Sequence, residues 1–213
     1  PGQLGQALEI EFAGHTRKLN LPLIGAYQAA NALVSAGLAL ATGGAADQVF
    51  DALTRLQPVR GRLERAAITR TGAPIYVDYA HTPDALEAAI AALRPHCMGR
   101  LIVVFGAGGD RDTGKRAPMG KVVAEQADLG IVTDDNPRSE DPAVIRSQVL
   151  GGGAGLREVA DRRAAIAAAI AEAQAEDIVL VAGKGHEQGQ IIGAGTDCRV
   201  LPFDDVAVAR ECA

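Results

Sequence analysis

Two short polar stretches combine an arginine, a glutamate and several glycines in a pattern that could bind an amino acid. The first reads Asp-Asn-Pro-Arg at 135–138 and the second Gly-Lys-Gly-His-Glu at 183–187, each directly after an apolar run. A guanidinium on a rigid Asn-Pro turn suits bidentate binding of a carboxylate, so Arg138 is the candidate for that group. Glu187 supplies the opposite charge, and the flanking glycines let backbone approach a ligand closely. Together they predict a clamp for an amino-acid head group.

Both stretches also have a purely structural interpretation. Asp and Asn favour tight turns, Pro fixes φ, and Asp141 followed by Pro142 can cap and begin a helix. A glycine-rich turn after a strand is equally ordinary. The residue types alone leave the structural and the functional interpretation open.

The two stretches belong to a regular alternation of predicted strands and helices over residues 61–213. Continuous apolar runs predict buried strands, and segments with helical periodicity predict the helices between them. Such alternation is typical of an α/β fold, here a Rossmann-like three-layer domain with a mostly parallel sheet. The predicted strands are 63–70, 74–77, 101–105, 129–133, 156–159 and 178–182, and the predicted helices 83–93, 119–126, 142–150, 162–175 and 204–211.

Residues 1–60 follow a different pattern. Two short strands are predicted at 8–12 and 17–21, and two helices at 27–40 and 46–56. Residues 57–61 then break the helical pattern with a proline and a glycine. We therefore predict a first domain at 1–60, a second at 61–213, and a hinge between them.

Four strands of the second domain are followed by polar loops, at 78–84, 106–116, 134–141 and 183–187. In open α/β sheets, ligands bind beyond the carboxyl ends of the strands. The four loops therefore predict one shared binding site.

Three familiar motifs are matched only in part. The glycine-rich run at 106–111 has Arg111 where a dinucleotide fingerprint needs its third glycine, and Arg116 follows the Gly-Lys pair where a P-loop needs Ser or Thr. His186 and Glu187 lack a second histidine, because Gln190 stands in its place. We predict no dinucleotide fingerprint, no P-loop and no metal site in this chain.

The composition narrows the class of protein. The 213 residues are 48% hydrophobic and 22% charged, with a net charge of −5, which argues against nucleic acid or an anionic membrane as a partner. Apolar runs stay short of the roughly 18 residues of a membrane span. Three cysteines without metal spacing indicate thiols in a reducing compartment, so we expect a cytoplasmic protein.

Taken in order, four motifs resemble the C-terminal domain of the Mur ligases. They are Asp-Tyr-Ala-His-Thr-Pro-Asp at 78–84, the glycine-rich loop at 106–116, Asp-Asn-Pro-Arg at 135–138 and Gly-Lys-Gly-His-Glu at 183–187. The resemblance is strongest to the type that adds the third residue of the peptidoglycan stem peptide. Residues 23–33 resemble the end of that family's central ATPase domain. Since the chain starts at Pro1, we expect a fragment that lacks the family's P-loop and is inactive alone.

The resemblance implies a monomeric ATP-dependent amide ligase that adds meso-diaminopimelate to UDP-MurNAc-L-Ala-D-Glu. ATP and Mg²⁺ would be bound mainly by upstream residues. In this family Asp-Asn-Pro-Arg goes with diaminopimelate, while lysine-adding relatives usually lack the arginine. The positions matched to diaminopimelate binding are Arg111, Asp135, Asn136, Pro137, Arg138, Gly183 and Glu187, and those matched to nucleotide binding are Asn31, Arg62, Asp78 and His81.

Two alternatives remain open at this stage. One is another ligase of the same superfamily, such as a folylpolyglutamate synthetase or a ligase that recycles peptides. The other is a domain without catalysis that captures an amino acid or a nucleotide.

Overall fold

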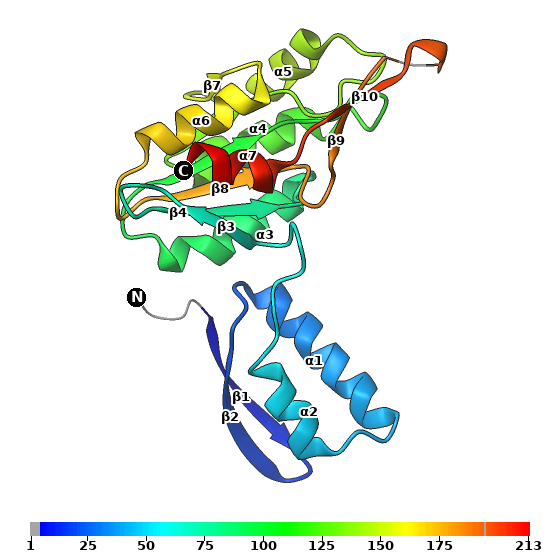
Figure 1. The fold of residues 1–213 in the computed structure, drawn as a ribbon, viewed down its shortest axis with the longest axis vertical. Helices are drawn as coiled ribbons and strands as arrows, with labels where there is room; N and C mark the ends of the chain where they lie inside the picture. The colour runs from blue at the N-terminus through cyan, green and yellow to red at the C-terminus, as the bar shows by residue number, and fades with distance from the viewer. Residues whose placement is uncertain (1–4, 194) are drawn as a thin grey trace. The chain divides into compact units, whose positions relative to one another are not determined.

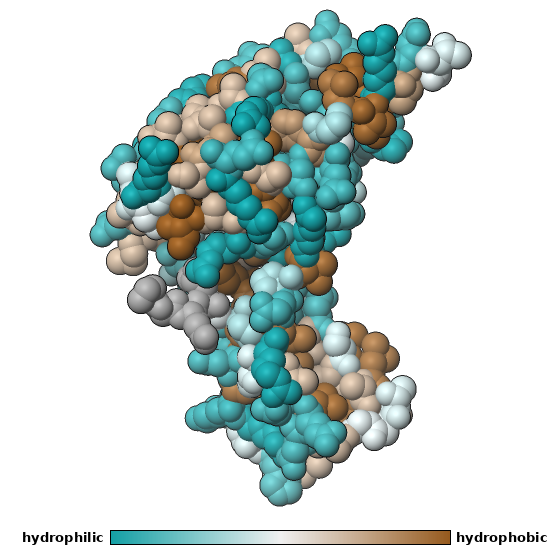
Figure 2. Space-filling view, viewed as in Figure 1, coloured by the Kyte–Doolittle hydropathy of each residue, from teal (hydrophilic) through white to brown (hydrophobic). Residues whose placement is uncertain are grey.

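A computed structural model describes residues 5–193 and 195–213 and divides the chain into two compact units, Pro1–Pro58 and Val59–Ala213. Figure 1 shows the course of the chain through both units. On the face drawn in Figure 2, hydrophilic residues predominate and hydrophobic residues lie in small groups. None of the described helices is long and apolar enough to span a membrane.

The first unit is a β-hairpin packed against two helices. Strands β1 (Gln6–Phe12) and β2 (His15–Leu21) pair antiparallel, and the helices are α1 (Ala26–Ala41) and α2 (Ala46–Leu53). All four elements were predicted. Their small core contains the buried side chains of Leu21, Leu23, Ala32, Ala36, Phe50 and Leu53.

The second unit is built on a six-stranded sheet in the order β3-β4-β8-β5-β6-β7. Only β3 runs antiparallel to its neighbour, and every other pair is parallel, which confirms the predicted sheet. The strands are β3 (Glu64–Ile68), β4 (Pro74–Asp78), β5 (Leu101–Phe105), β6 (Leu129–Val132), β7 (Arg157–Glu158) and β8 (Ile178–Ala182).

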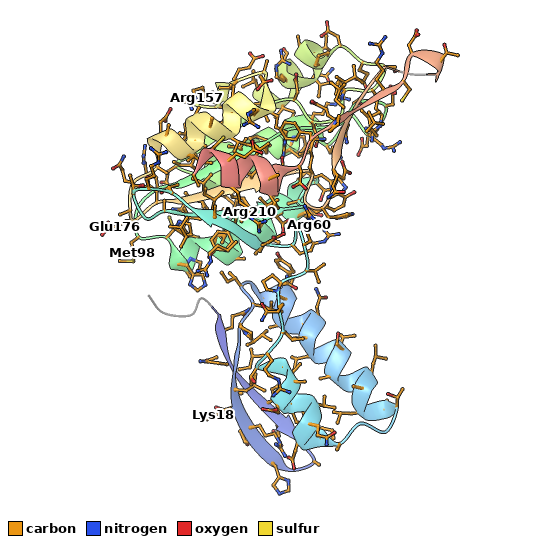
Figure 3. All side chains as sticks on the ribbon, in the orientation of Figure 1. Lys18, Arg60, Met98, Arg157, Glu176 and Arg210 are labelled. Atoms are coloured by element: carbon orange, nitrogen blue, oxygen red, sulfur yellow. The ribbon has the colours of Figure 1, made fainter. Side chains whose placement is uncertain are left out.

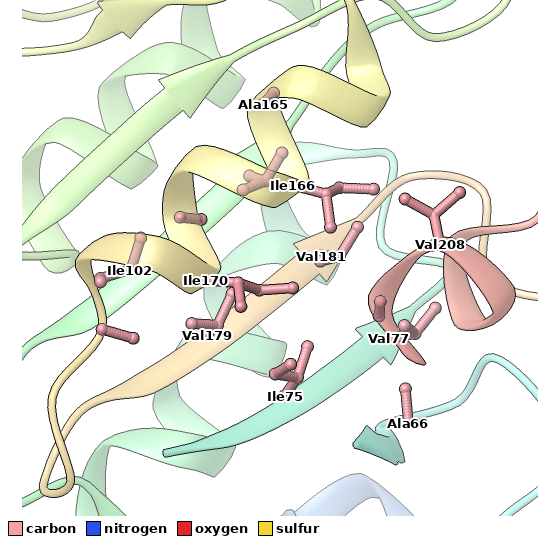
Figure 4. Close-up of a cluster of buried hydrophobic side chains, with 14 of the residues drawn as sticks. Ala66, Ile75, Val77, Ile102, Ala165, Ile166, Ile170, Val179, Val181 and Val208 are labelled. Atoms are coloured by element: carbon pink, nitrogen blue, oxygen red, sulfur yellow. The ribbon is translucent and has the colours of Figure 1, made fainter. Parts of the chain in front are cut away.

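Helices flank this sheet and complete the three layers (Figure 1). They are α3 (Pro83–Leu93), α4 (Arg116–Gln126), α5 (Pro142–Leu150), α6 (Arg162–Glu172) and α7 (Asp205–Cys212), with a short 3-10 turn at Arg94–His96. Figure 4 shows the core on the side of α6 and α7, where Ile166, Ile170 and Val208 pack with Val179 and Val181 of β8. Alternate strand residues point to opposite faces, so a second apolar layer forms on the other side.

Acidic and hydroxyl side chains set where four helices begin. Asp141, Asp161 and Asp204 accept backbone hydrogen bonds at the starts of α5, α6 and α7, as Thr82 does for α3. The cap expected at Asp141 is therefore confirmed. Each such cap stabilises its helix by about 1 kcal/mol.

The last helix is fastened to the edge strand β3 by arginines. Arg210 donates from Nε to the Ala66 oxygen over 3.0 Å and pairs with Glu64 at 3.5 Å, while Arg60 pairs with Asp204. Arg60 and Arg210 are labelled in Figure 3. These contacts place α7 against β3 and cover part of this sheet edge.

Two predicted features are wrong. No strand was predicted between residues 187 and 204, but this stretch contains an antiparallel hairpin of β9 (Gly189–Ile192) and β10 (Arg199–Pro202), with a 3-10 turn at Gly195–Asp197. Helix α4 begins at Arg116 and not at residue 119, and this first residue of the helix is itself buried. Both differences affect the candidate site.

Candidate functional site

Parallel pairing brings the four polar loops to one edge of the sheet. Strands β4, β8, β5 and β6 are consecutive neighbours, so their carboxyl ends lie side by side. Backbone bonds link adjacent loops: Gly183 donates to the Asp78 oxygen over 3.1 Å, and Gly109 to the Asn136 oxygen over 2.8 Å. The convergence expected from sequence is present in the fold.

Arg116 ties the loop after β5 to the loop after β6. Its side chain is 1% exposed and forms a bidentate pair with Glu140, at 2.8 and 2.9 Å. The same guanidinium donates to the Gly108 oxygen at 3.1 Å and to Gln148 at 2.7 Å. Paired and enclosed in this way, Arg116 holds loops in place and has no open face for a ligand.

A second set of bonds joins the same two loops nearer the surface. Asp110 has a left-handed backbone, with φ of 52°, and its carboxylate accepts from the Ser139 hydroxyl at 2.5 Å and from the Ser139 N–H at 3.2 Å. These hydrogen bonds lower the pKa of Asp110. The Asp110 N–H in turn donates to Glu140 over 2.6 Å. The two loops therefore form one bonded assembly.

The backbone of Arg138 is fixed by hydrogen bonds, while its guanidinium forms no ion pair with any described residue. Its φ is 51°, and hairpin strand β9 fixes this conformation: the Arg138 N–H donates to the Ile191 oxygen at 3.1 Å, and the Gly193 N–H donates to the Arg138 oxygen at 2.8 Å. The guanidinium donates to the backbone oxygens of Gly109 and Asn136, at 2.9 and 3.4 Å. Among the described residues, no carboxylate forms an ion pair with this half-buried side chain.

Asn136 lies between the arginine loop and the glutamate loop. Its Nδ2 donates to Glu187 Oε2 over 2.9 Å, while its Oδ1 accepts from Lys184 Nζ at 2.7 Å. Glu187 keeps a third of its side chain exposed, whereas Lys184 is completely buried. Arg138 and Glu187 thus flank Asn136 and are not bonded to each other.

Asp135 lies below this layer in a buried group of charges. Its carboxylate is 3.1 Å from Lys184 Nζ. Burial alone would raise the pKa of Asp135, but Arg162 and Lys184 outweigh burial and hold that pKa below its ordinary value. Arg162 itself forms a bidentate pair with Asp205, at 2.8 and 2.7 Å, in which both side chains are 0% exposed. Asp135 therefore faces protein cations.

Gly183 occupies the narrow space above Asp135. Its φ is 121°, and a Cβ placed there would lie 2.9 Å from Asp135 Oδ2. Both the conformation and the close approach require glycine at this position. The loop after β8 is thereby seated on the loop after β6.

The residues matched to nucleotide binding in the second unit gather around Tyr79. The Arg62 guanidinium lies 4.6 Å from the Tyr79 ring centroid, and the His81 ring lies 4.5 Å from it on edge. Asp78 is buried and accepts from the Leu63 and Ala80 N–H groups, each at 2.8 Å. Burial raises the pKa of Asp78, and this effect outweighs the two backbone hydrogen bonds, which lower it.

Three predicted residues stand apart from these contacts. Asn31 lies exposed on α1 in the first unit. Arg111 is exposed, and within the described part of the chain its side chain donates to the oxygen of neighbouring Asp110 alone, at 3.3 Å. Pro137 is buried within its loop.

Sequence reasoning missed Arg116 and Arg162 as parts of the site, and it placed Lys184 in the motif at 183–187 without expecting the side chain to be buried. All three are long cations that are almost fully buried. Arg116 and Arg162 each begin a helix directly after a polar loop, and that position was the available signal. Their acidic partners are 24 and 43 residues away, so spacing could not reveal the pairs.

Among the described residues, no group of three or more His, Cys, Asp or Glu side chains could hold a metal ion. The carboxylates near the site are instead paired with arginine, lysine or backbone N–H groups. The chemistry available here is recognition: one open guanidinium and one accessible carboxylate suit a ligand with both charges.

Comparison with known proteins gives consistent results. A profile described as "Mur ligase, glutamate ligase domain" matches residues 61–185. The chain is 62% identical over 207 residues to the UDP-N-acetylmuramoyl-L-alanyl-D-glutamate–2,6-diaminopimelate ligase of Zymomonas mobilis, covering 97% of this chain and 43% of that protein. It is 56% identical to the protein of the same name in Caulobacter vibrioides, in an alignment that covers 97% of this chain and 42% of that protein.

Solved structures agree with these relatives. A structure of a ligase with the same name matches with a TM-score of 0.68 and 35% identity, covering 97% of this chain and 42% of that one. The Mycobacterium tuberculosis folylpolyglutamate synthase, complexed with ADP and AMPPCP, matches with a TM-score of 0.65 and 25% identity, covering 84% and 42%. The chain spans about two fifths of the length of these proteins.

Proposed function

Because the chain belongs to the Mur ligase family, we propose that it is the C-terminal part of an ATP-dependent ligase that adds meso-diaminopimelate to UDP-MurNAc-L-Ala-D-Glu. Residues 61–213 would hold the incoming amino acid. Residues 1–60 would be the end of the central ATP-binding domain, and residues 57–61 the hinge.

The observation that carries this proposal is that the unpaired guanidinium of Arg138 and the accessible carboxylate of Glu187 both contact Asn136. Diaminopimelate differs from lysine by a second carboxylate on its distal carbon. Arg138 would bind that carboxylate and Glu187 an ammonium group, with Asn136 between them. An arginine left without its carboxylate costs about 1–3 kcal/mol, which suffices for strong discrimination against lysine.

The reaction would proceed through an acyl phosphate. ATP phosphorylates the glutamate carboxylate of the UDP-linked dipeptide, giving ADP. The amine of diaminopimelate then attacks the acyl carbon, an amide forms, and phosphate and the amine proton leave. The residues of this chain contribute by holding the amine in position, which makes attack effectively unimolecular.

Arg62, Asp78 and His81 would approach the nucleotide, and Asn31 its adenine. The Arg62–Tyr79 stack and the buried Asp78 give this part of the edge a fixed shape. The described residues offer no acidic cluster for Mg²⁺, so we assign that ion no role within this chain. We expect the 213 residues alone to be inactive in ligation.

Calorimetry of this chain with meso-diaminopimelate, and with lysine as control, tests the proposal directly. We expect saturable binding of diaminopimelate and much weaker binding of lysine. Equal binding of both amino acids would contradict it. Glutamate and an intact tripeptide serve as further ligands, because the likeness to a folylpolyglutamate synthase makes a related ligase the second candidate.

Two further properties follow from the same proposal. The three cysteines are free, which fits a reducing compartment such as the cytoplasm. We also expect a monomer, which sedimentation velocity of this chain would check.

A further inference from the structure

Lys184 is a buried cation that no step of the proposed reaction requires. Its side chain is 0% exposed, between two glycines in the loop after β8. The ammonium lies 2.7 Å from Asn136 Oδ1, 3.0 Å from the Gly189 oxygen and 3.1 Å from Asp135 Oδ1. The first two contacts are hydrogen bonds and the third is an ion pair, and Glu187 Oε2 lies farther away, at 4.0 Å from Lys184 Nζ. Lys184 therefore joins the loops after β6 and β8 from inside.

These contacts determine which way the Asn136 amide points. Its Oδ1 accepts from Lys184 Nζ and also from the Ile191 N–H, at 2.7 and 2.9 Å. Reversing the amide would set its NH₂ group against an ammonium and a second N–H donor. With Oδ1 fixed on that side, Nδ2 must face Glu187, to which it donates over 2.9 Å.

We propose that Lys184 is a positioning residue for the amino-acid site, which acts through Asn136 to hold the Glu187 carboxylate toward the incoming ammonium group. This inference rests on the proposed function, since it assigns a role within the same proposed amino-acid site. Lys184 does not touch the ligand, because it is fully enclosed. Its effect is to keep one acceptor in one orientation before the ligand arrives.

The proposal predicts a specific pattern of binding. Replacing Lys184 with methionine preserves length and removes the charge, so the Asn136 amide is free to turn and Glu187 loses its donor. Both diaminopimelate and lysine carry an ammonium group, so both should bind about tenfold more weakly or worse. Their affinity ratio should not change, because Arg138 is untouched.

Calorimetry of the 213-residue chain tests this with four proteins: the unchanged chain, Lys184→Met, Glu187→Gln and the double variant. If Lys184 acts through Glu187, the double variant should bind diaminopimelate no more than about threefold more weakly than Glu187→Gln. Losses that multiply in the double variant would overturn the proposal, as would unchanged binding in Lys184→Met. Lys121→Met, at an exposed lysine on α4, is the matched control and should bind normally.

A measurement without ligand separates this proposal from the proposed function. In ¹H–¹⁵N spectra, the Asn136 side-chain NH₂ signals should exchange slowly in the unchanged chain and rapidly in Lys184→Met. Slow exchange in both would refute the positioning role, whatever the ligand result. Failure of the unchanged chain to bind diaminopimelate would instead overturn the proposed function, and with it the role assigned to Glu187.

A second variant covers the case in which Lys184→Met does not fold. Ile191→Pro removes the other donor to Asn136 Oδ1 and leaves the buried ion pair intact, at a strand position where the N–H points away from β10. It should increase the Asn136 NH₂ exchange rate and weaken diaminopimelate binding in the same direction. A folded Ile191→Pro chain with unchanged exchange and unchanged affinity would refute the inference.

Discussion

The side-chain amide of Asn136 donates to the carboxylate of Glu187 over 2.9 Å, which joins the loop after β6 to the loop after β8. The residues of the predicted clamp are therefore connected before any ligand binds. Arg138 lies on one side of Asn136 with an unpaired guanidinium, and Glu187 lies on the other. The variants below test Arg138, the glycine that seats the two loops together, and two buried polar groups of the second unit.

Arg138→Ala should remove selectivity between the two amino acids. We expect diaminopimelate affinity to fall by about ten- to a hundredfold, while lysine affinity stays nearly constant, because only diaminopimelate has the distal carboxylate. Calorimetry with both ligands measures the ratio. Arg163→Ala, at an exposed arginine paired with Glu211, is the control and should preserve it. An undiminished ratio in Arg138→Ala would exclude Arg138 as the selective group.

Gly183→Ala should destabilise the chain and weaken diaminopimelate binding together. The new methyl group would lie 2.9 Å from Asp135 Oδ2 at a φ of 121°, so both strain and a close contact arise. Gly155→Ala is the control, since Gly155 also has a positive φ but has open space around it. In urea unfolding, Gly183→Ala should lose at least about 1 kcal/mol more than Gly155→Ala. Equal losses would mean that the loop can shift without cost.

Arg162→Ala and Arg163→Ala compare adjacent arginines on α6. Removing Arg162 leaves Asp205 buried without its partner, which should lower the free energy of unfolding by about 3–5 kcal/mol. Removing Arg163 breaks an exposed pair and should cost about 0–1 kcal/mol. Chemical denaturation of both variants gives the difference. Similar values would show that the buried pair is not needed for stability.

Tyr76→Phe should have its main effect on the stability of the protein in alkaline solution. Burial raises the pKa of Tyr76 to about 12, so its phenol stays neutral in the folded state while an unfolded chain ionises near pH 10. The free energy of unfolding is therefore unaffected by Tyr76 below about pH 10. As the pH rises toward 12, ionisation of Tyr76 in the unfolded chain lowers the free energy of unfolding, by up to about 3 kcal/mol.

Tyr76→Phe has no phenol to ionise, so its free energy of unfolding should not show this alkaline decrease. Among the described residues the Tyr76 hydroxyl has no hydrogen-bond partner, so Tyr76→Phe should be neutral or slightly stabilising at pH 7. Thermal unfolding of both proteins between pH 7 and 12 makes the comparison. Parallel pH curves would mean that Tyr76 ionises normally in the folded state.

Much of the fold could be predicted because its strands are continuous apolar runs. Residues 101–105 and 178–182 are fully buried on both faces, which is typical of strands in a parallel sheet covered by helices on both sides. The family suggested by four ordered motifs is confirmed by the match over residues 61–185. Because each polar loop directly follows a predicted parallel strand, the position of the four loops at the carboxyl edge of the sheet could be predicted as well.

The contacts inside the site could not be predicted. Hairpin β9–β10 contains glycine, glutamine and proline and keeps exposed apolar residues such as Val200, so it lacks a strong alternating pattern. Buried pairs such as Arg116 with Glu140 join residues far apart in sequence. Local patterns do not show which charged residue will be enclosed, because enclosure depends on the packing of whole elements.

The hairpin that sequence reasoning missed also holds the proposed binding arginine from a distant part of the chain. Through Ile191, strand β9 is hydrogen-bonded to the backbone of Arg138 and to the side chain of Asn136, more than fifty residues earlier in the chain. Substitutions in the hairpin would therefore shift the backbone of Arg138 while Arg138, Asn136 and Glu187 themselves stay unchanged. In the proposed site, amino-acid preference thus depends on residues that do not touch the ligand.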